Sequence, residues 1–177
     1  MFFETESTAP VILIGQRRGK AVKRLRIYVD TSVIGGCEDE EFSGASRQLW
    51  SKFRTGEYIL VISDLTMQEV ETAPENVRRH LQDIPASHLI QIDLNTEAKE
   101  LADAYIAHGV VGPGSLADAL HVALATVSAV DVLVSWNFKH IVNLGRIRLF
   151  NAVNLEQGYG LIEIRTPKEV LYEKEDV

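Results

Sequence analysis

Short apolar runs alternate along most of the chain with segments whose apolar residues recur at helical spacing. Runs rich in β-branched and aromatic residues predict strands, at residues 26–30, 58–63, 89–93, 132–135 and 161–166. Apolar positions three or four apart predict helices, at residues 44–56, 65–73, 74–84, 96–109, 115–129, 138–145 and 148–158. A last helical turn is predicted after Thr166, where Pro167 suits the first helical position and Glu169 completes a capping box.

Strands separated by helices favour parallel pairing with right-handed crossovers. The pattern therefore predicts a three-layer α/β/α sandwich with a central, mainly parallel sheet. The helix at 115–129 is apolar over most of its surface, so we expect it to be central. We expect one domain over residues 25–177, preceded by a basic N-terminal extension, residues 1–24, in which residues 11–14 could add a short strand.

Composition narrows the class of protein without identifying a function. The chain has 177 residues, 46% of them hydrophobic and 24% charged, which is typical of a globular protein. It has one cysteine, no apolar run of the length needed to cross a bilayer, and no basic leader at its start. We therefore expect a soluble, cytoplasmic protein without membrane association.

Charge is distributed unevenly along the chain. The formal net charge is −7, but residues 1–26 contain six basic residues and two acids, so the remainder is strongly acidic. The basic run is either a solvated extension or an arm that binds phosphate. An acidic body is compatible with an enzyme acting on nucleic acid only if metal ions mask its carboxylates.

Two aspartates stand where a parallel sheet places its sites, outside the carboxyl ends of the strands. Asp30 ends the first predicted strand, and Thr31 and Ser32 follow it as turn or helix-capping residues. Asp118 lies three residues after Ser115, a spacing that fits a capping box near the positive end of a helix dipole. For both aspartates the alternative is a purely structural capping role.

Other acids compete for the same role. Asp103 lies on an amphipathic helix, and Asp131 precedes a strand at the wrong edge of the sheet. Glu69 lies on the short helix after the second strand, with Glu71 as its rival. A single glutamate on a polar helix face is usually solvated, so the pattern alone favours Glu69 weakly.

Ser135 and Asn137 lie just beyond the fourth predicted strand. The Asn137 amide oxygen is a neutral, hard ligand suited to magnesium or manganese, although the residue type is equally common in turns. Carboxylates gathered at one sheet edge repel one another unless a cation is present. With Mg²⁺ or Mn²⁺, such a cluster can activate water and stabilise charge on a phosphodiester.

The runs YVDTSVIGG, Glu69-Val70, ADALHVALA and LVSWNFKHI occur in an order and spacing that resemble the successive motifs of PIN-domain proteins, especially the VapC toxin ribonucleases of bacterial toxin–antitoxin pairs. This resemblance extends from about Arg26 to the C-terminus. It implies a PIN fold, a divalent metal, cleavage of single-stranded RNA, a cognate antitoxin and a homodimer.

The same resemblance assigns the three main acidic roles to Asp30, Glu69 and Asp118. Ser135 matches a position where the family often has Thr or Ser, and Asn137 stands where many members have an aspartate. One negative charge is therefore missing. That departure keeps open a non-catalytic module that binds RNA or a protein, and a DNA-cleaving enzyme is a third alternative. His121, one helical turn after Asp118, is either a general base or a packed, hydrogen-bonded helix residue.

Overall fold

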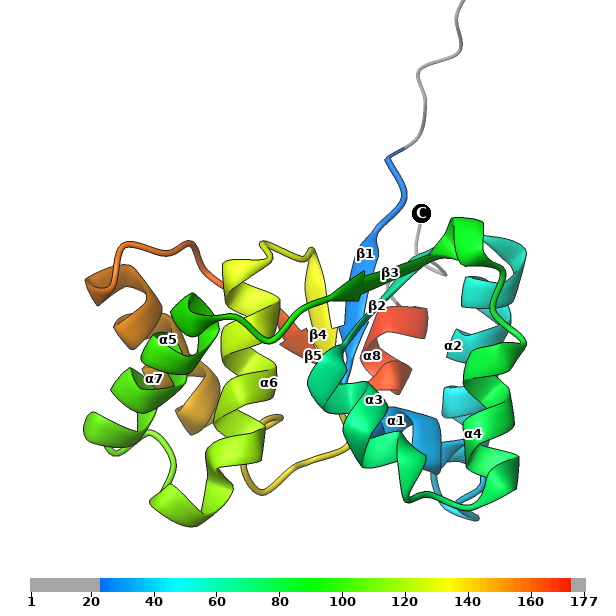
Figure 1. The fold of residues 1–177 in the computed structure, drawn as a ribbon, viewed down its shortest axis with the longest axis horizontal. Coiled ribbons are helices and arrows are strands. Elements are labelled where there is room, and N and C mark those ends of the chain that lie inside the picture. Colours follow the sequence, from blue (N-terminus) through cyan, green and yellow to red (C-terminus); the bar gives the residue numbers. More distant parts are fainter. Residues whose placement is uncertain (1–22, 173–177) are drawn as a thin grey trace, which may run out of the picture.

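Five parallel strands form the centre of the computed structural model, which describes residues 23–172 (Figure 1). The strands are β1 (Arg26–Val29), β2 (Ile59–Ser63), β3 (Leu89–Ile92), β4 (Val132–Val134) and β5 (Ile164–Arg165). They lie in the order β3-β2-β1-β4-β5, and every neighbouring pair is parallel. The predicted α/β sandwich with a parallel sheet is confirmed.

Helices cover both faces of this sheet, and Figure 1 shows them as two groups on either side of it. One group contains α1 (Thr31–Gly36), α2 (Ser43–Thr55), α3 (Asp64–Glu71), α4 (Glu75–Gln82) and α8 (Pro167–Tyr172). The other contains α5 (Thr96–Ala107), α6 (Leu116–Val127) and α7 (Leu144–Glu156). Two short 3₁₀ turns, Ala86–His88 and Pro113–Ser115, precede β3 and α6.

Alternation of side chains along the strands supplies a separate hydrophobic core to each face. Tyr28 and Leu133 face the core shared with α5, α6 and α7. Val29 and Val134 face the core shared with α1, α2 and α8. Because both faces are covered, β2 and β4 are apolar at every position except Ser63, whereas β1 begins with Arg26 and the edge strand β3 contains Gln91. Helix α6 is buried over most of its length, as the sequence predicted.

Helix α1 was not predicted as a helix, because Gly35 and Gly36 have low helix propensity and suggested a loose connection. Its packing against α2 explains the second glycine. A Cβ on Gly36 would lie 2.7 Å from the Ser46 hydroxyl and 2.9 Å from the Trp136 ring. Residue 36 therefore has to be glycine because Ser46 and Trp136 pack too close for a side chain, and only the tertiary structure shows this contact.

The helix predicted at 138–145 is wrong. Residues 138–141 form turns, and α7 begins at Leu144, so Gly145 lies in its first turn instead of ending a helix. The Asn143 side chain caps α7 by accepting hydrogen bonds from the backbone N–H groups of Gly145 and Arg146. Helical spacing of apolar residues could not distinguish a packed turn from a helix here.

The last predicted elements differ in length from those observed. Strand β5 has two residues instead of six, because its one neighbour in the described sheet, β4, is itself only three residues long. The capping box that follows is confirmed. Glu169 accepts a hydrogen bond from the Thr166 backbone N–H at 2.7 Å, and the Thr166 hydroxyl accepts one from the Glu169 N–H at 3.3 Å.

The amino ends of β1 and β4 are joined by Asp131, at the sheet edge opposite the candidate site. Asp131 accepts hydrogen bonds from the Lys23 ammonium at 2.6 Å and from the Arg26 backbone N–H at 2.8 Å. This position explains why Asp131 is structural.

The predicted strand at 11–14, and residues 1–22 of the predicted extension, lie outside the described residues.

We expect the Asp131→Asn variant to lose about 0.5–1.5 kcal/mol of stability at pH 7, the usual net value of a hydrogen-bonded contact. Partial burial opposes ionisation of Asp131, but its contacts with Lys23 and Arg26 outweigh burial and lower its pKa below the usual 3.8. A lowered pKa stabilises the fold above pH 3.8 and stops doing so as the pH falls through the folded-state value. Urea unfolding from pH 7 to pH 3 should therefore show the two proteins converging in acid, and a constant difference would contradict this account.

Candidate active site at the carboxyl ends of the strands

The order of the strands places a crevice between β1 and β4. After β1 the chain continues into α1 on one face, whereas α7, which follows β4, packs on the other face. Connections that leave in opposite directions open a crevice outside the carboxyl ends of the two strands. Asp30 directly follows β1, and Ser135 directly follows β4, so both lie at this point.

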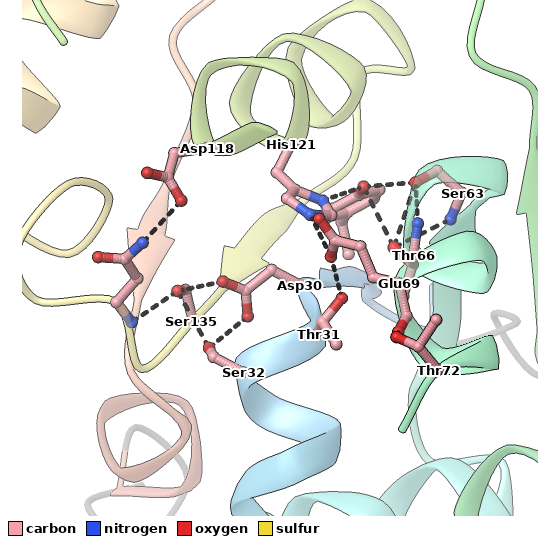
Figure 2. Close-up of polar contacts among 12 residues, drawn as sticks. Asp30, Thr31, Ser32, Ser63, Thr66, Glu69, Thr72, Asp118, His121 and Ser135 are labelled. Atoms are coloured by element: carbon pink, nitrogen blue, oxygen red, sulfur yellow. Dashed lines mark hydrogen bonds and ion pairs between the residues drawn. The ribbon is translucent and has the colours of Figure 1, made fainter. Parts of the chain in front are cut away.

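The Asp30 carboxylate is held by two serine hydroxyls rather than by a helix cap. Asp30 is the N-cap residue of α1, but its side chain makes no capping hydrogen bond. Instead Ser32 donates to one carboxylate oxygen at 2.5 Å, and Ser135 donates to the other at 2.6 Å (Figure 2). The Asp30 side chain therefore does not act as a helix cap, which was the alternative role for this residue.

Both hydroxyls are oriented by backbone groups. The Ser32 oxygen accepts from the Trp136 N–H at 2.9 Å, and the Ser135 oxygen accepts from the Asn137 N–H at 2.8 Å. Because each oxygen accepts one proton from the backbone, its own proton is directed at Asp30. The chain segment after β4 thus fixes the orientation of a carboxylate that belongs to β1.

Asp30 is 4% exposed and, within residues 23–172, forms no ion pair with a lysine or arginine. Burial raises the pKa of its carboxyl, although His121 and the hydroxyls of Ser135 and Ser32 act in the opposite direction. A buried carboxylate without an ion-pair partner is costly to keep ionised. Such a group suits a site where a bound cation supplies the missing positive charge.

Asp118 lies in the first turn of α6, but the predicted capping box with Ser115 does not form. Ser115 is the N-cap residue and makes no side-chain capping contact. The Asp118 carboxylate instead accepts a hydrogen bond from the Asn137 amide nitrogen at 2.8 Å. The Asn137 amide oxygen accepts from the His140 backbone N–H at 2.9 Å. Asn137 therefore presents a donor to Asp118, not the ligand oxygen that the sequence suggested.

Glu69 projects from α3, and one of its oxygens accepts two hydrogen bonds. The donors are the Thr31 hydroxyl and the His121 Nε2, the latter at 3.1 Å. Burial opposes ionisation of Glu69, but the two hydrogen bonds and the charge of His121 outweigh it and lower the pKa of the carboxyl. Glu69 is thus kept as an ionised acceptor. Glu71, the alternative acid on this helix, is exposed, and its side chain makes no hydrogen bond to another described residue.

The three acids surround the same crevice without touching one another. In the view of Figure 2, Asp30 lies between Asp118 and Glu69. Ser135 and Asn137 link Asp30 to Asp118, whereas Glu69 is bound separately by Thr31 and His121. Within residues 23–172, no three His, Cys, Asp or Glu side chains lie close enough to form a metal site by themselves. The set is nevertheless made of hard oxygen donors, the type that Mg²⁺ and Mn²⁺ bind.

Residues that the sequence did not single out complete the surroundings of the site. The Tyr28 hydroxyl lies 2.7 Å from His121 Nδ1 and 2.8 Å from the Ser63 hydroxyl. In the sequence, Tyr28 is an ordinary aromatic strand residue, and no sequence signal links it to Glu69.

None of the helices in residues 23–172 has both the length and the apolar character of a membrane span.

The chain matches one protein family and is similar in fold to solved structures. The PIN domain family profile matches residues 27–137. The fold is similar to that of VapC20 from Mycobacterium tuberculosis, a toxin that cleaves the sarcin–ricin loop, with a TM-score of 0.50 and 12% identity over 64% of this chain and 92% of that one. VapBC2 from Rickettsia felis was solved with a promoter DNA fragment. Its TM-score is 0.49 and its sequence identity 11%, over 80% of this chain and 98% of that one. No curated protein matches.

Proposed function

Because the chain belongs to the PIN domain family, we propose that it is a divalent-metal-dependent endoribonuclease and the toxin of a type II toxin–antitoxin pair. The observation that carries the proposal is the buried Asp30 carboxylate at the β1–β4 crevice, which forms no ion pair with a lysine or arginine among the described residues. Asp118 and Glu69 come from α6 and α3, on either side of Asp30 in Figure 2. A cation bound there would offset the cost of the buried charge.

Asp30, Asp118 and Glu69 would hold the metal, which supplies Lewis acidity and lowers the pKa of bound water. The protein's own contribution is orientation. Ser32 and Ser135 fix the Asp30 carboxylate, and the Asn137 amide fixes Asp118. Asn137 acts on the site through Asp118 in this arrangement, so we assign it a supporting role rather than direct ligation.

The proposed partners are an RNA substrate, an antitoxin protein and a second copy of the chain. The toxin assignment draws on the resemblance of the motifs in Asp30–Gly36 and Ala117–Ala125 to VapC proteins. A gene for a short DNA-binding antitoxin directly beside this one would support it. Light scattering of the purified protein, alone and with that antitoxin, would test the two assemblies.

The proposed activity is tested by RNA cleavage with Mg²⁺ or Mn²⁺, with EDTA, and in the Asp118→Asn variant. We expect EDTA to abolish cleavage and Asp118→Asn to reduce it at least 100-fold, about the loss of one strong electrostatic contact at the reacting centre. The matched control is Asp103→Asn, which neutralises an exposed aspartate on neighbouring α5 and should leave the rate unchanged. Cleavage that persists in EDTA would contradict the mechanism.

The substrate panel should contain single-stranded RNA, single-stranded DNA, a structured tRNA and a sarcin–ricin loop oligonucleotide. Preference for single-stranded DNA would replace the proposed ribonuclease with a DNA-cleaving enzyme. The last oligonucleotide is included because VapC20 from Mycobacterium tuberculosis cleaves the sarcin–ricin loop.

A non-catalytic module that binds RNA or protein is the second candidate. The orientation of Asn137 favours it, because a neutral donor faces Asp118 where many PIN enzymes have another acid. This candidate predicts no heat of Mn²⁺ binding in calorimetry and no cleavage of any member of the panel.

A further inference from the structure

His121 is a buried histidine with a partner on each ring nitrogen. Its side chain is 4% exposed, Nε2 lies 3.1 Å from a Glu69 oxygen, and Nδ1 lies 2.7 Å from the Tyr28 hydroxyl. Glu69 is an ionised acceptor, so the proton on the ring faces it from Nε2. In the neutral imidazole Nδ1 then accepts from the Tyr28 O–H, and in the imidazolium it donates to the Tyr28 oxygen. Neither nitrogen is left for a proton transfer in the crevice.

The contacts of His121 continue back to the helix that carries Glu69. The Tyr28 hydroxyl lies 2.8 Å from the hydroxyl of Ser63, the N-cap residue of α3. Ser63 in turn accepts from the Thr66 backbone N–H at 3.2 Å within a capping box. A closed ring therefore runs from Glu69 on α3 through α6 and β1 to the start of α3 (Figure 2).

This ring determines how Glu69 is presented. A glutamate side chain has several rotatable bonds, and ordering it costs free energy. The Thr31 hydroxyl and His121 both bind the same carboxylate oxygen, Oε2. Within residues 23–172 the second oxygen, Oε1, has no protein hydrogen-bond donor, so it remains free to bind a cation.

We propose that His121 is a positioning residue for Glu69, held in its orientation by the Tyr28 hydroxyl. This inference rests on the proposed function, because it assigns Glu69 to the metal. His121 does not touch the RNA or the reacting atoms. It holds one Glu69 oxygen in a hydrogen bond and leaves the other available, as second-layer hydrogen bonds do for metal ligands in general.

The test compares His121→Gln with His121→Asn. The amide nitrogen of Gln reaches about as far as Nε2 and can still donate to Glu69, whereas the shorter Asn reaches only toward Tyr28. We expect His121→Asn to weaken Mn²⁺ binding and to lower kcat about 10–100-fold with KM for RNA unchanged. His121→Gln should stay within a few-fold of wild type in both measurements.

A second pair of variants separates positioning from stability. Tyr28→Phe removes the hydroxyl that orients His121, and Tyr105→Phe removes another buried hydroxyl, bound to Asn154 at the far end of α6 near Thr126. Both should lower the denaturation midpoint by similar amounts. Only Tyr28→Phe should also weaken Mn²⁺ binding and reduce kcat.

Equal losses in His121→Gln and His121→Asn, or equal Mn²⁺ affinities for the two tyrosine variants, would overturn the positioning role while leaving the nuclease proposal intact. A wild-type protein that neither binds Mn²⁺ nor cleaves RNA would overturn the proposed function, and this inference with it.

Discussion

The Asp30→Asn variant is expected to be more stable than the wild-type protein without metal and to have no measurable nuclease activity. Burial raises the pKa of the Asp30 carboxyl, which means that the folded protein disfavours the ionised form of this side chain. An amide removes that charge. We expect a gain of about 0.5–2 kcal/mol in EDTA, in the range of stabilising changes made at functional sites.

The hydroxyls around Asp30 can accommodate the amide. Ser32 and Ser135 lie 3.4 Å apart, so one hydroxyl can turn its proton to the other and accept from the new amide N–H. The remaining amide oxygen still accepts from a serine. The two serines therefore supply partners for the amide oxygen and for one amide N–H, and the loss of charge dominates the outcome.

Metal should reverse the order of stability. A cation that binds only the folded wild-type protein stabilises it by about 2.7 kcal/mol at 100 times its Kd, whereas Asp30→Asn should gain nothing. Urea unfolding in EDTA and in excess Mn²⁺ measures both effects. A variant less stable than wild type in EDTA would show that the carboxylate is structural.

The pH dependence of stability supplies an independent check in EDTA. The Asp30 pKa is above its usual 3.8 in the folded protein, so the folded state holds more protons than the unfolded state between the two values. The contribution of Asp30 to stability therefore falls as the pH rises through that window. The Asn variant should lack this component, so its advantage should grow with pH and disappear in acid.

The Asn137→Asp variant is expected to be less stable without metal and more active with it. The Asn137 amide nitrogen donates to Asp118 at 2.8 Å, and an aspartate would place a second carboxylate at that distance. A lost charge-assisted hydrogen bond and like-charge repulsion together should cost about 1–3 kcal/mol in EDTA. With Mn²⁺ the added charge should tighten binding about tenfold or more.

Asn143→Asp is the matched control for this change. Asn143 is a nearby exposed asparagine whose side-chain oxygen also accepts backbone N–H groups, at the start of α7. Aspartate suits that position and the helix dipole, so stability and Mn²⁺ affinity should change little. Calorimetry and denaturation of both variants decide the case. Unchanged Mn²⁺ affinity in Asn137→Asp would place residue 137 outside the metal's reach.

The sequence determined the fold because its local patterns agree with its packing. The central strands β2 and β4 are mostly apolar since both faces of the sheet are covered, and several helices have a recognisable start or end, such as the Thr166–Glu169 capping box. Parallel pairing then follows from the alternation of strands and helices. The rule that sites lie outside the carboxyl ends of the strands directed attention to Asp30 and Ser135.

The tertiary structure decided what those residues contact. Sequence spacing suggested that Asp118 caps with Ser115 and that Asn137 offers an oxygen, but the actual pair is Asp118 with the Asn137 nitrogen. The bond between Glu69 and His121 joins residues 52 positions apart on different faces of the sheet. Local patterns carry no information about such contacts, because only the packing of α3 and α6 against β1 brings the side chains together. Hydrogen-bond direction, burial and the raised pKa of Asp30 are properties of that packing.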